Sequence, residues 1–269
     1  MLKRILENCS GKLIEGIKSN MQIGYNEFTE DSYRAIVKQA ASKYLFVNYG
    51  YKGSELHAIW RHDVDFSLNR SLKLAQIEAE LGVTSTWFIL LRSEYYNPLE
   101  IDASSVLKKI LGLGHKIGLH IDLAAYPEVV TDGQLTAAIQ FEAGILEKEF
   151  DISISEFAFH NPNPRNESFS SYRIGEYVNA SASYFRTEYT YASDSNGYWR
   201  FKSIPTVIQE GTGQNLCILT HPVWWTPSAQ SPFERVKRAI TGRALYAENY
   251  YCNLLKQYGR INIGHESKS

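Results

Sequence analysis

Residues that can bind a metal ion or move a proton stand at the ends of several apolar runs in this chain. Four runs end in this way, the first with Asp63 and Asp65 and the later ones with His120, His160 and His221. Charged side chains are costly to order at such positions unless a partner binds them. Carboxylates and imidazoles are common ligands of divalent ions, and a second carboxylate can take a proton from a water that the ion activates. The pattern therefore indicates a site for metal binding and proton transfer.

The first of these runs, "AIWRHDVDFS", can be examined as a strand. Alternate side chains of a strand share a face, so Arg61, Asp63 and Asp65 should point one way and His62 the other. Arg61 would then keep Asp63 ionised. The alternative is that both aspartates cap the following helix or pair with arginine at the surface. The histidines that end the other runs favour the site.

Strand-like and helix-like patterns alternate along the chain and would position these residues. Ser67 is a plausible N-cap, and Ser231 begins a capping box that Glu234 completes. The expected helices cover 67–82, 102–115, 135–150 and a last segment from 231, and the expected strands cover 84–90, 116–121, 154–160 and 215–221. This alternation predicts a mainly parallel α/β sheet with helices outside it, either open or closed as a barrel. Strand ends of such a sheet share one edge, where sites are built.

Composition narrows the possible partners. The 269 residues include 28 Lys and Arg against 29 Asp and Glu, so the formal net charge is -1 and nothing favours nucleic acid or an anionic membrane. The basic start has no signal-peptide core, and the longest apolar run, 87–91, is far too short for a membrane span. We therefore expect a cytoplasmic protein. Residues 1–55 are expected to form a helical N-terminal extension packed on the main domain, 56–269.

Four motifs in this order carry a family resemblance. The segments "RHDVDFS", "LGHKIGLHID", "FHNP" and "ILTHPVWW" resemble those of the polysaccharide deacetylase, or NodB-homology, family of carbohydrate esterases. The chain looks most like the branch associated with surface-polysaccharide and O-antigen biosynthesis, over about residues 59–225. The resemblance implies a distorted, incomplete (β/α) barrel. It also implies a hydrolase that uses a divalent metal, usually zinc, to remove acetyl from an N-acetylated sugar.

The resemblance also assigns roles to individual residues. In that family the first aspartate of the opening motif is the general base and the second is a metal ligand, which correspond to Asp63 and Asp65. The first histidine of the next motif is a metal ligand and corresponds to His120. The late histidine, His221, corresponds to the general acid.

Two departures concern the third metal ligand. The family's second metal histidine is replaced by Ala124, and an arginine motif is replaced by His160 and the two residues after it. His160 could complete a set of Asp65, His120 and His160 with an open position for water. Asp122 is the rival third ligand, or a group that orients an imidazole. If neither completes the set, the alternative is a protein that binds a glycan without catalysis.

Four further residues have two readings each. Asp194 resembles an acidic family residue that steadies the catalytic base through a neighbour, but "SDSNG" is equally typical of a turn. Trp224 and Trp225 could form an aromatic floor for a sugar, with one of them touching substrate, or belong to the core. His115 is expected to bond the last carbonyls of the preceding helix rather than a metal.

Two other classes compete with a metal-dependent deacetylase. One is a metal-independent glycosidase that uses two carboxylates, which would leave the strand-end histidines unexplained. The other is a catalytically inactive deacetylase-like protein that binds glycans. The sequence leaves open whether the carbohydrate is a nucleotide sugar, a glycan precursor or a polymer, and whether the group is N-acetyl, O-acetyl or formyl. The metal is also open among zinc, cobalt and other divalent ions.

Overall fold

The computed structural model describes residues 24–161, 163–211 and 213–264. Its strands are β1 (Leu45–Val47), β2 (His57–Val64), β3 (Thr86–Leu90), β4 (Lys116–Ile121), β5 (Glu156–Phe159), β6 (Arg173–Ile174), β7 (Tyr177–Asn179), β8 (Thr190–Ser193) and β9 (Leu216–Thr220). Its helices are α2 (Glu30–Ala41), α3 (Leu68–Glu80), α4 (Ile101–Gly112), η1 (Leu123–Ala125), α5 (Asp132–Phe150), α6 (Pro164–Glu167), α7 (Tyr184–Thr187), α8 (Ile204–Glu210), η2 (Pro222–Trp224) and α9 (Pro232–Gln257).

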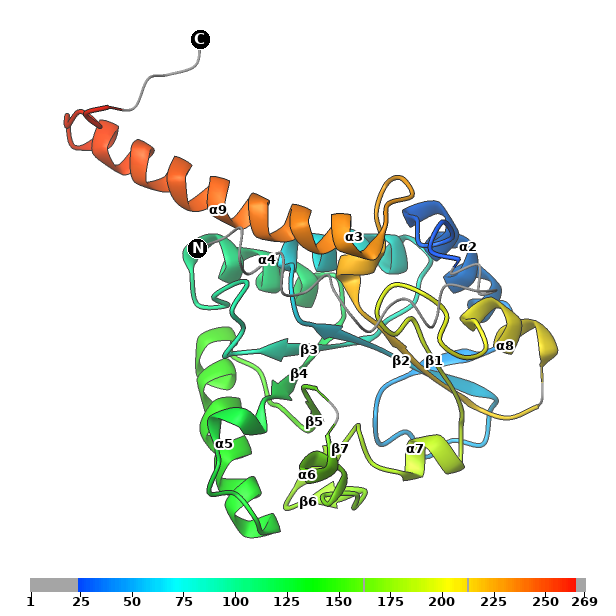
Figure 1. The fold of residues 1–269 in the computed structure, drawn as a ribbon. Coiled ribbons are helices and arrows are strands. Elements are labelled where there is room, and N and C mark those ends of the chain that lie inside the picture. Colours follow the sequence, from blue (N-terminus) through cyan, green and yellow to red (C-terminus); the bar gives the residue numbers. More distant parts are fainter. Residues whose placement is uncertain (1–23, 162, 212, 265–269) are drawn as a thin grey trace, which may run out of the picture.

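The strands form one curled sheet. They pair in the order β6, β7, β5, β4, β3, β2, β9, β8, and β1 pairs with β2 (Figure 1). Every pair is parallel except β6 with β7. Among the described residues no pairing joins β6 to β8, so the barrel does not close. The expected α/β fold, a distorted and incomplete (β/α) barrel, is confirmed.

Local sequence signals place the main helices and strands as expected. The hydroxyl of Ser67 accepts a hydrogen bond from Arg70 N at the start of α3. Ser231 and Glu234 form the full capping box of α9. Strand β4 covers the expected segment 116–121 without a change of bounds.

The N-terminal segment departs in part from a purely helical extension. Helix α2 lies inside the expected helical extension 1–55, but Leu45–Val47 form β1, which pairs with the first half of β2. The segment therefore contributes to the sheet as well as covering it. Residues 1–23 of the expected extension lie outside the described residues, and the boundary between 55 and 56 stays a prediction.

Alternation along the strands divides the core into two faces. All of β2 is buried, as expected when helices and the barrel interior cover opposite faces of a parallel sheet. Trp60 and Val64 pack on the helix side, whereas Ile59 packs inside the curl with Phe88 and Cys217. Arg61 and Asp63 have the same parity as Ile59, so they point into the curl.

The same parity places the histidine of β4 in the interior. Leu119 and Ile121 pack on the helix side, so His120 points inward with Gly118. A Cβ at Gly118 would lie 2.6 Å from the ring of Phe88, which explains why glycine stands below the histidine.

A buried polar network lies behind β2, on its helix side. The carboxylate of Glu78 in α3 lies 2.8 Å from His62 Nε2, accepts from Ser85 Oγ at 2.6 Å and lies 3.6 Å from His115 Nδ1. His115 Nε2 hydrogen-bonds to the carbonyl of Ala75 in α3, so its expected contact with the end of its own preceding helix, α4, is wrong. The network ties α3 to β2, β3 and β4.

We expect Glu78→Gln to lower the free energy of unfolding by about 3 to 5 kcal/mol, because it removes one partner of a fully buried pair. Burial alone would raise the pKa of Glu78, but the charges of His62 and His115 hold it below its usual value. Ionised Glu78 therefore contributes stability above its unfolded pKa of about 4.3, and that contribution is lost as the pH falls through the folded pKa. Urea unfolding at neutral and acidic pH measures both effects.

Glu80→Gln provides the matched control on the same helix. Glu80 pairs with Arg34 at the surface, where the two side chains are 58% and 40% exposed. Its loss should change stability by less than about 1 kcal/mol. Equal effects of the two substitutions would contradict a stabilising role for the buried network.

Helix α9 lies across the outside of α3 and α4 and projects beyond them (Figure 1). Arg243 holds it to Glu100, just before α4, and the hydroxyl of Tyr246 donates to Asp102. Among the described residues no helix is both long and apolar enough to cross a membrane.

Candidate active site

Three of the sequence-predicted residues meet at the carboxyl edge of the sheet. The donor atoms of Asp65, His120 and His160 all lie within 4.8 Å of one another. Asp65 Oδ1 is 3.2 Å from His120 Nε2 and 3.4 Å from His160 Nδ1. These three residues are the candidate ligand set expected from the sequence, in which His160 takes the place of the histidine missing at position 124.

The sheet orients His120. Its Nδ1 lies 3.1 Å from the carbonyl oxygen of Ala158 on β5, and a carbonyl can only accept a hydrogen bond. Nδ1 therefore carries a proton, and Nε2 is the ring nitrogen that faces Asp65. Holding one ring nitrogen in this way is typical of metal-binding histidines.

Charges within the group are strongly coupled. Burial alone would raise the pKa of Asp65, but the imidazoles of His120, His160 and His221 hold it well below its usual range. Burial would lower the pKa of His160, but the carboxylates of Asp65 and Asp122 raise it. This lowered pKa favours the ionised carboxylate of Asp65, which is the state in which a carboxylate binds a cation.

Asp63 lies beside this group. Its Oδ2 is 3.2 Å from Arg61 Nη2 and 3.9 Å from His120 Nε2. Arg61 is itself anchored, because its Nη1 donates to the carbonyl of Ala180 at 2.6 Å. Asp63 Oδ1 is buried and makes no hydrogen bond within the described part of the chain. The carboxylate therefore keeps one oxygen available as an acceptor.

His221 forms a second polar unit with Asp194. Asp194 Oδ1 lies 2.6 Å from His221 Nδ1, and its Oδ2 accepts from His221 N at 2.7 Å and from Trp225 Nε1 at 2.9 Å. Burial would lower the pKa of His221, but the charge of Asp194 raises it to about 9. His221 Nε2 faces the metal-ligand group, 3.9 Å from Asp65 Oδ2. A protonated imidazole thus points at the site.

The structure bears out the turn reading of Asp194 and gives its side chain another role than steadying the predicted base Asp63. Its backbone carbonyl accepts from Gly197 N and so begins a turn, while its fully buried side chain orients His221. Its carboxylate hydrogen-bonds to His221 and Trp225 and not to Asp63.

Of the remaining predicted residues, some line a cavity at this edge of the sheet and one lies in the protein core. Asp122 and Trp224 line the cavity at this edge, whereas Trp225 is fully buried and holds Asp194. Asp122 Oδ1 accepts from Ala124 N and caps η1, and it is not a member of the close donor group. Trp224 is therefore the tryptophan placed to meet a ligand.

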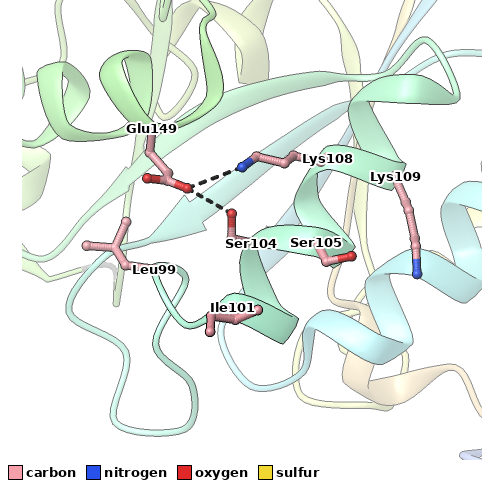
Figure 2. A pocket seen from close by; sticks show the side chains of 7 residues that line it. All are labelled: Leu99, Ile101, Ser104, Ser105, Lys108, Lys109 and Glu149. Atoms are coloured by element: carbon pink, nitrogen blue, oxygen red, sulfur yellow. Dashed lines mark hydrogen bonds and ion pairs between the residues drawn. The ribbon is translucent and has the colours of Figure 1, made fainter.

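The cavity has a volume of about 660 Å³. Beside Asp65 and His221 it is lined by the aromatic rings of Phe66, Tyr95 and Trp224, and Phe66 lies 4.3 Å from Tyr95 between ring centroids. A second hollow, of about 490 Å³, lies over α4 and the end of α5 (Figure 2). Its charged lining is lysine and glutamate without histidine, and Glu149 there is already bonded to Lys108 and Ser104 (Figure 2).

The donor set fits a divalent cation. One carboxylate and two imidazoles match the ligands of catalytic zinc. Asp65 Oδ1 is buried yet has no contact of hydrogen-bond geometry within the described residues, although two imidazole nitrogens approach it. A cation between these atoms would satisfy a carboxylate oxygen that is otherwise costly to bury.

Comparisons with known proteins give weak likenesses to solved structures. No protein-family model and no curated protein matches the chain. A Streptococcus pyogenes deacetylase in complex with acetate shares 11% identity over 74% of this chain and 92% of its own, with a TM-score of 0.43. A Bacillus cereus polysaccharide deacetylase shares 15% identity over 79% and 93%, with a TM-score of 0.39. A CE4 family pseudoenzyme from Bacillus anthracis shares 10% identity over 75% and 65%, also at 0.39.

The chain is similar to polysaccharide deacetylases. The similar structures include both deacetylases and a pseudoenzyme, so the similarity carries no argument about catalysis. The activity of this chain must therefore be argued from its own site.

Sequence reasoning missed two side chains that hydrogen-bond to the backbone of candidate ligands. Ser93 Oγ donates to the carbonyl of Asp65 at 2.9 Å, and Asn166 Nδ2 donates to the carbonyl of His160 at 3.0 Å. Serine and asparagine in loops are too common to signal such a role, and only the fold brings these two to the ligands.

We expect Asp194→Asn to lower the rate of hydrolysis about 10²- to 10⁴-fold with bound metal unchanged. Asparagine has one acceptor oxygen, so it cannot serve His221 N, His221 Nδ1 and Trp225 Nε1 together. Rates and metal content of the purified variant test this. Asp102→Asn, which alters a carboxylate that accepts from Tyr246 far from the site, should leave the rate unchanged. Normal turnover by Asp194→Asn would show that His221 needs no such partner.

Proposed function

We propose that this chain is a divalent-metal-dependent hydrolase that removes an acetyl or other N-acyl group from a sugar. The observation that carries the proposal is the close donor group of Asp65, His120 and His160, beside which lie an unbonded carboxylate oxygen of Asp63 and the protonated imidazole of His221. A base, an acid and a cation site close together are what amide hydrolysis requires.

Asp65, His120 and His160 would hold the metal. When bound, the ion would polarise the acyl carbonyl and make a water molecule more acidic. Zinc suits this set best, since two imidazoles and one carboxylate leave a tetrahedral position open. Among the described residues the alternative ligand Asp122 is not in the close group, so we assign it to the cavity wall.

Asp63 would take the proton of the attacking water. Its Oδ2 faces Arg61, which favours the ionised carboxylate, and its Oδ1 is the acceptor left for that proton. Arg61 thus supplies a guanidinium partner for the base from the same strand. The family's arginine motif is absent here, because His160 stands at its position.

His221 would protonate the departing amine nitrogen. Asp194 holds its Nδ1, so Nε2 is the nitrogen that faces the cavity. Water attacks the carbonyl carbon as one of its protons passes to Asp63, and the carbon–nitrogen bond breaks as one proton passes from His221 to nitrogen, which gives a carboxylic acid and a free amine. The acid then loses its proton to solvent and leaves as a carboxylate. A base and an acid beside the cation site fit this sequence.

A carbohydrate substrate is supported by the lining of the cavity. Phe66, Tyr95 and Trp224 offer apolar rings beside polar Asp122 and Ser195, a combination that suits the apolar faces and hydroxyls of a sugar. By the motif resemblance, we assign the sugar to a surface-polysaccharide or O-antigen precursor.

Acetate release is the direct test. The purified protein with zinc should release acetate from at least one member of a panel of free, oligomeric and nucleotide-linked N-acetylated sugars. A chelator should abolish release and added zinc should restore it. Release of reducing sugar that survives the chelator would instead support a glycosidase, and glycan binding without acetate release would support an inactive binding protein.

A further inference from the structure

The candidate ligands are held by the fold in two different ways. His120 lies inside β4, where its backbone pairs with Leu90 of β3 and Ala158 of β5. His160 is the first residue after β5, and its N still donates to the carbonyl of Ile121 at 2.8 Å. Its own carbonyl accepts from a side chain instead of a strand.

That side chain is Asn166, from the short helix α6. Its Nδ2 donates to the carbonyl of His160 at 3.0 Å and to that of Asn161 at 2.9 Å. Two carbonyls can only be served by the amide nitrogen, so the orientation of the side chain is fixed. Asn166 is 5% exposed, and its own N is bound by Asn163 Oδ1 at 3.0 Å. The donor is therefore buried and preorganised.

The turn held by Asn166 has an unfavourable backbone conformation. Asn161 has a φ of +52°, in the left-handed region that costs energy for residues with a Cβ. Such conformations persist when the surroundings enforce them, and they gather at functional sites. Asn163 Nδ2 adds a hydrogen bond to the carbonyl of Asn161 at 3.0 Å. The chain direction directly after His160 is thus imposed by side chains of α6 and its N-cap.

We propose that Asn166 is a positioning residue that aims the His160 imidazole at the metal by fixing the backbone on its C-terminal side. This inference rests on the proposed function, because it presumes that His160 binds the metal. Asp65, the first residue after β2, is held by the same kind of side-chain hydrogen bond, since Ser93 Oγ donates to its carbonyl. A ligand beyond its strand needs such a bond, whereas His120 inside the sheet does not.

The test measures binding of Co²⁺, whose visible absorption reports the ligand geometry. Asn166→Asp keeps the size of the side chain but places oxygen against two carbonyls, and Asn166→Ala removes the donor without adding a charge. Both variants should bind Co²⁺ about 10- to 100-fold more weakly, with an altered absorption band. Circular dichroism should show the wild-type fold.

Asn179→Asp is the matched control. Asn179 is buried and its Nδ2 also donates to two carbonyls, those of Phe169 and Ser171, neither of which belongs to a candidate ligand. Its substitution should lower stability and leave Co²⁺ affinity and absorption unchanged.

The outcomes separate the two proposals. Wild-type Co²⁺ binding with unaltered affinity and absorption in both Asn166 variants would overturn the positioning role and leave the proposed function intact. An equal loss of affinity in Asn179→Asp would also overturn it, since general loosening would then be the cause. A wild-type protein that binds no Co²⁺ would overturn both proposals.

Discussion

Asp63→Asn should abolish most turnover while the protein keeps its metal. The asparagine oxygen would face Arg61, because a guanidinium only donates, and this turns the NH₂ group to the position of Oδ1. The atom proposed to accept the water's proton is then replaced by one that cannot accept it. A general base contributes about 10²- to 10⁴-fold, and the rate of acetate release should fall by that factor.

Asp65→Asn is the matched partner of this variant, two residues along the same face of the chain. It replaces the carboxylate that contacts both His120 and His160, so we expect loss of metal as well as of activity. Measuring metal per chain beside the rate separates the two aspartates. If Asp63→Asn also lost its metal, or kept the wild-type rate, the division into base and ligand would be wrong.

His160→Ala should remove the metal from the purified protein. With two donors left, we expect affinity for zinc to fall by more than the roughly 100-fold that loss of a supporting group causes. Metal analysis of wild type and variant, before and after dialysis against zinc, measures this. We expect close to one equivalent in the wild type and almost none in the variant.

Two controls define what the His160 result means. His57→Ala removes another buried histidine, which lies at the opposite end of β2 and bonds to Tyr189, and it should leave the metal in place. Asp122→Asn should also retain metal. Retention by His160→Ala together with loss in Asp122→Asn would make Asp122 the third ligand. Wild-type protein that binds no metal would favour a glycan-binding protein.

Local patterns predicted strands β2, β3, β4, β5 and β9 and the direction of side chains in β2, whereas β1, β6, β7 and β8 were not predicted. The run 116–121 is largely apolar and follows a helix-ending glycine, and the parity of Asp63 and His62 follows from pleating alone. Parallel strands then bring their carboxyl ends to one edge, so the candidate site could be listed before the fold was known.

Contacts between distant parts of the chain could not be predicted in this way. Glu78 lies in a helix whose apolar stripe is evident from the sequence. The residues around it in the sequence do not predict that its carboxylate contacts His62 and His115. Asn166 belongs to a four-residue helix with no periodic signal. Strand β1 has only three residues, and it is a strand because it pairs with β2. Such features depend on packing rather than on local preference.

Strand β2 presents charged groups with fixed partners on both of its faces. A register slip of one residue would turn Asp63 toward α3 and His62 toward the cavity, because successive side chains alternate. A single inserted residue within β2 would therefore dismantle the candidate site and the buried Glu78 pair together, although it alters no ligand. The alignment of this strand against β3 and β9 is thus as necessary to the candidate site as the side chains themselves.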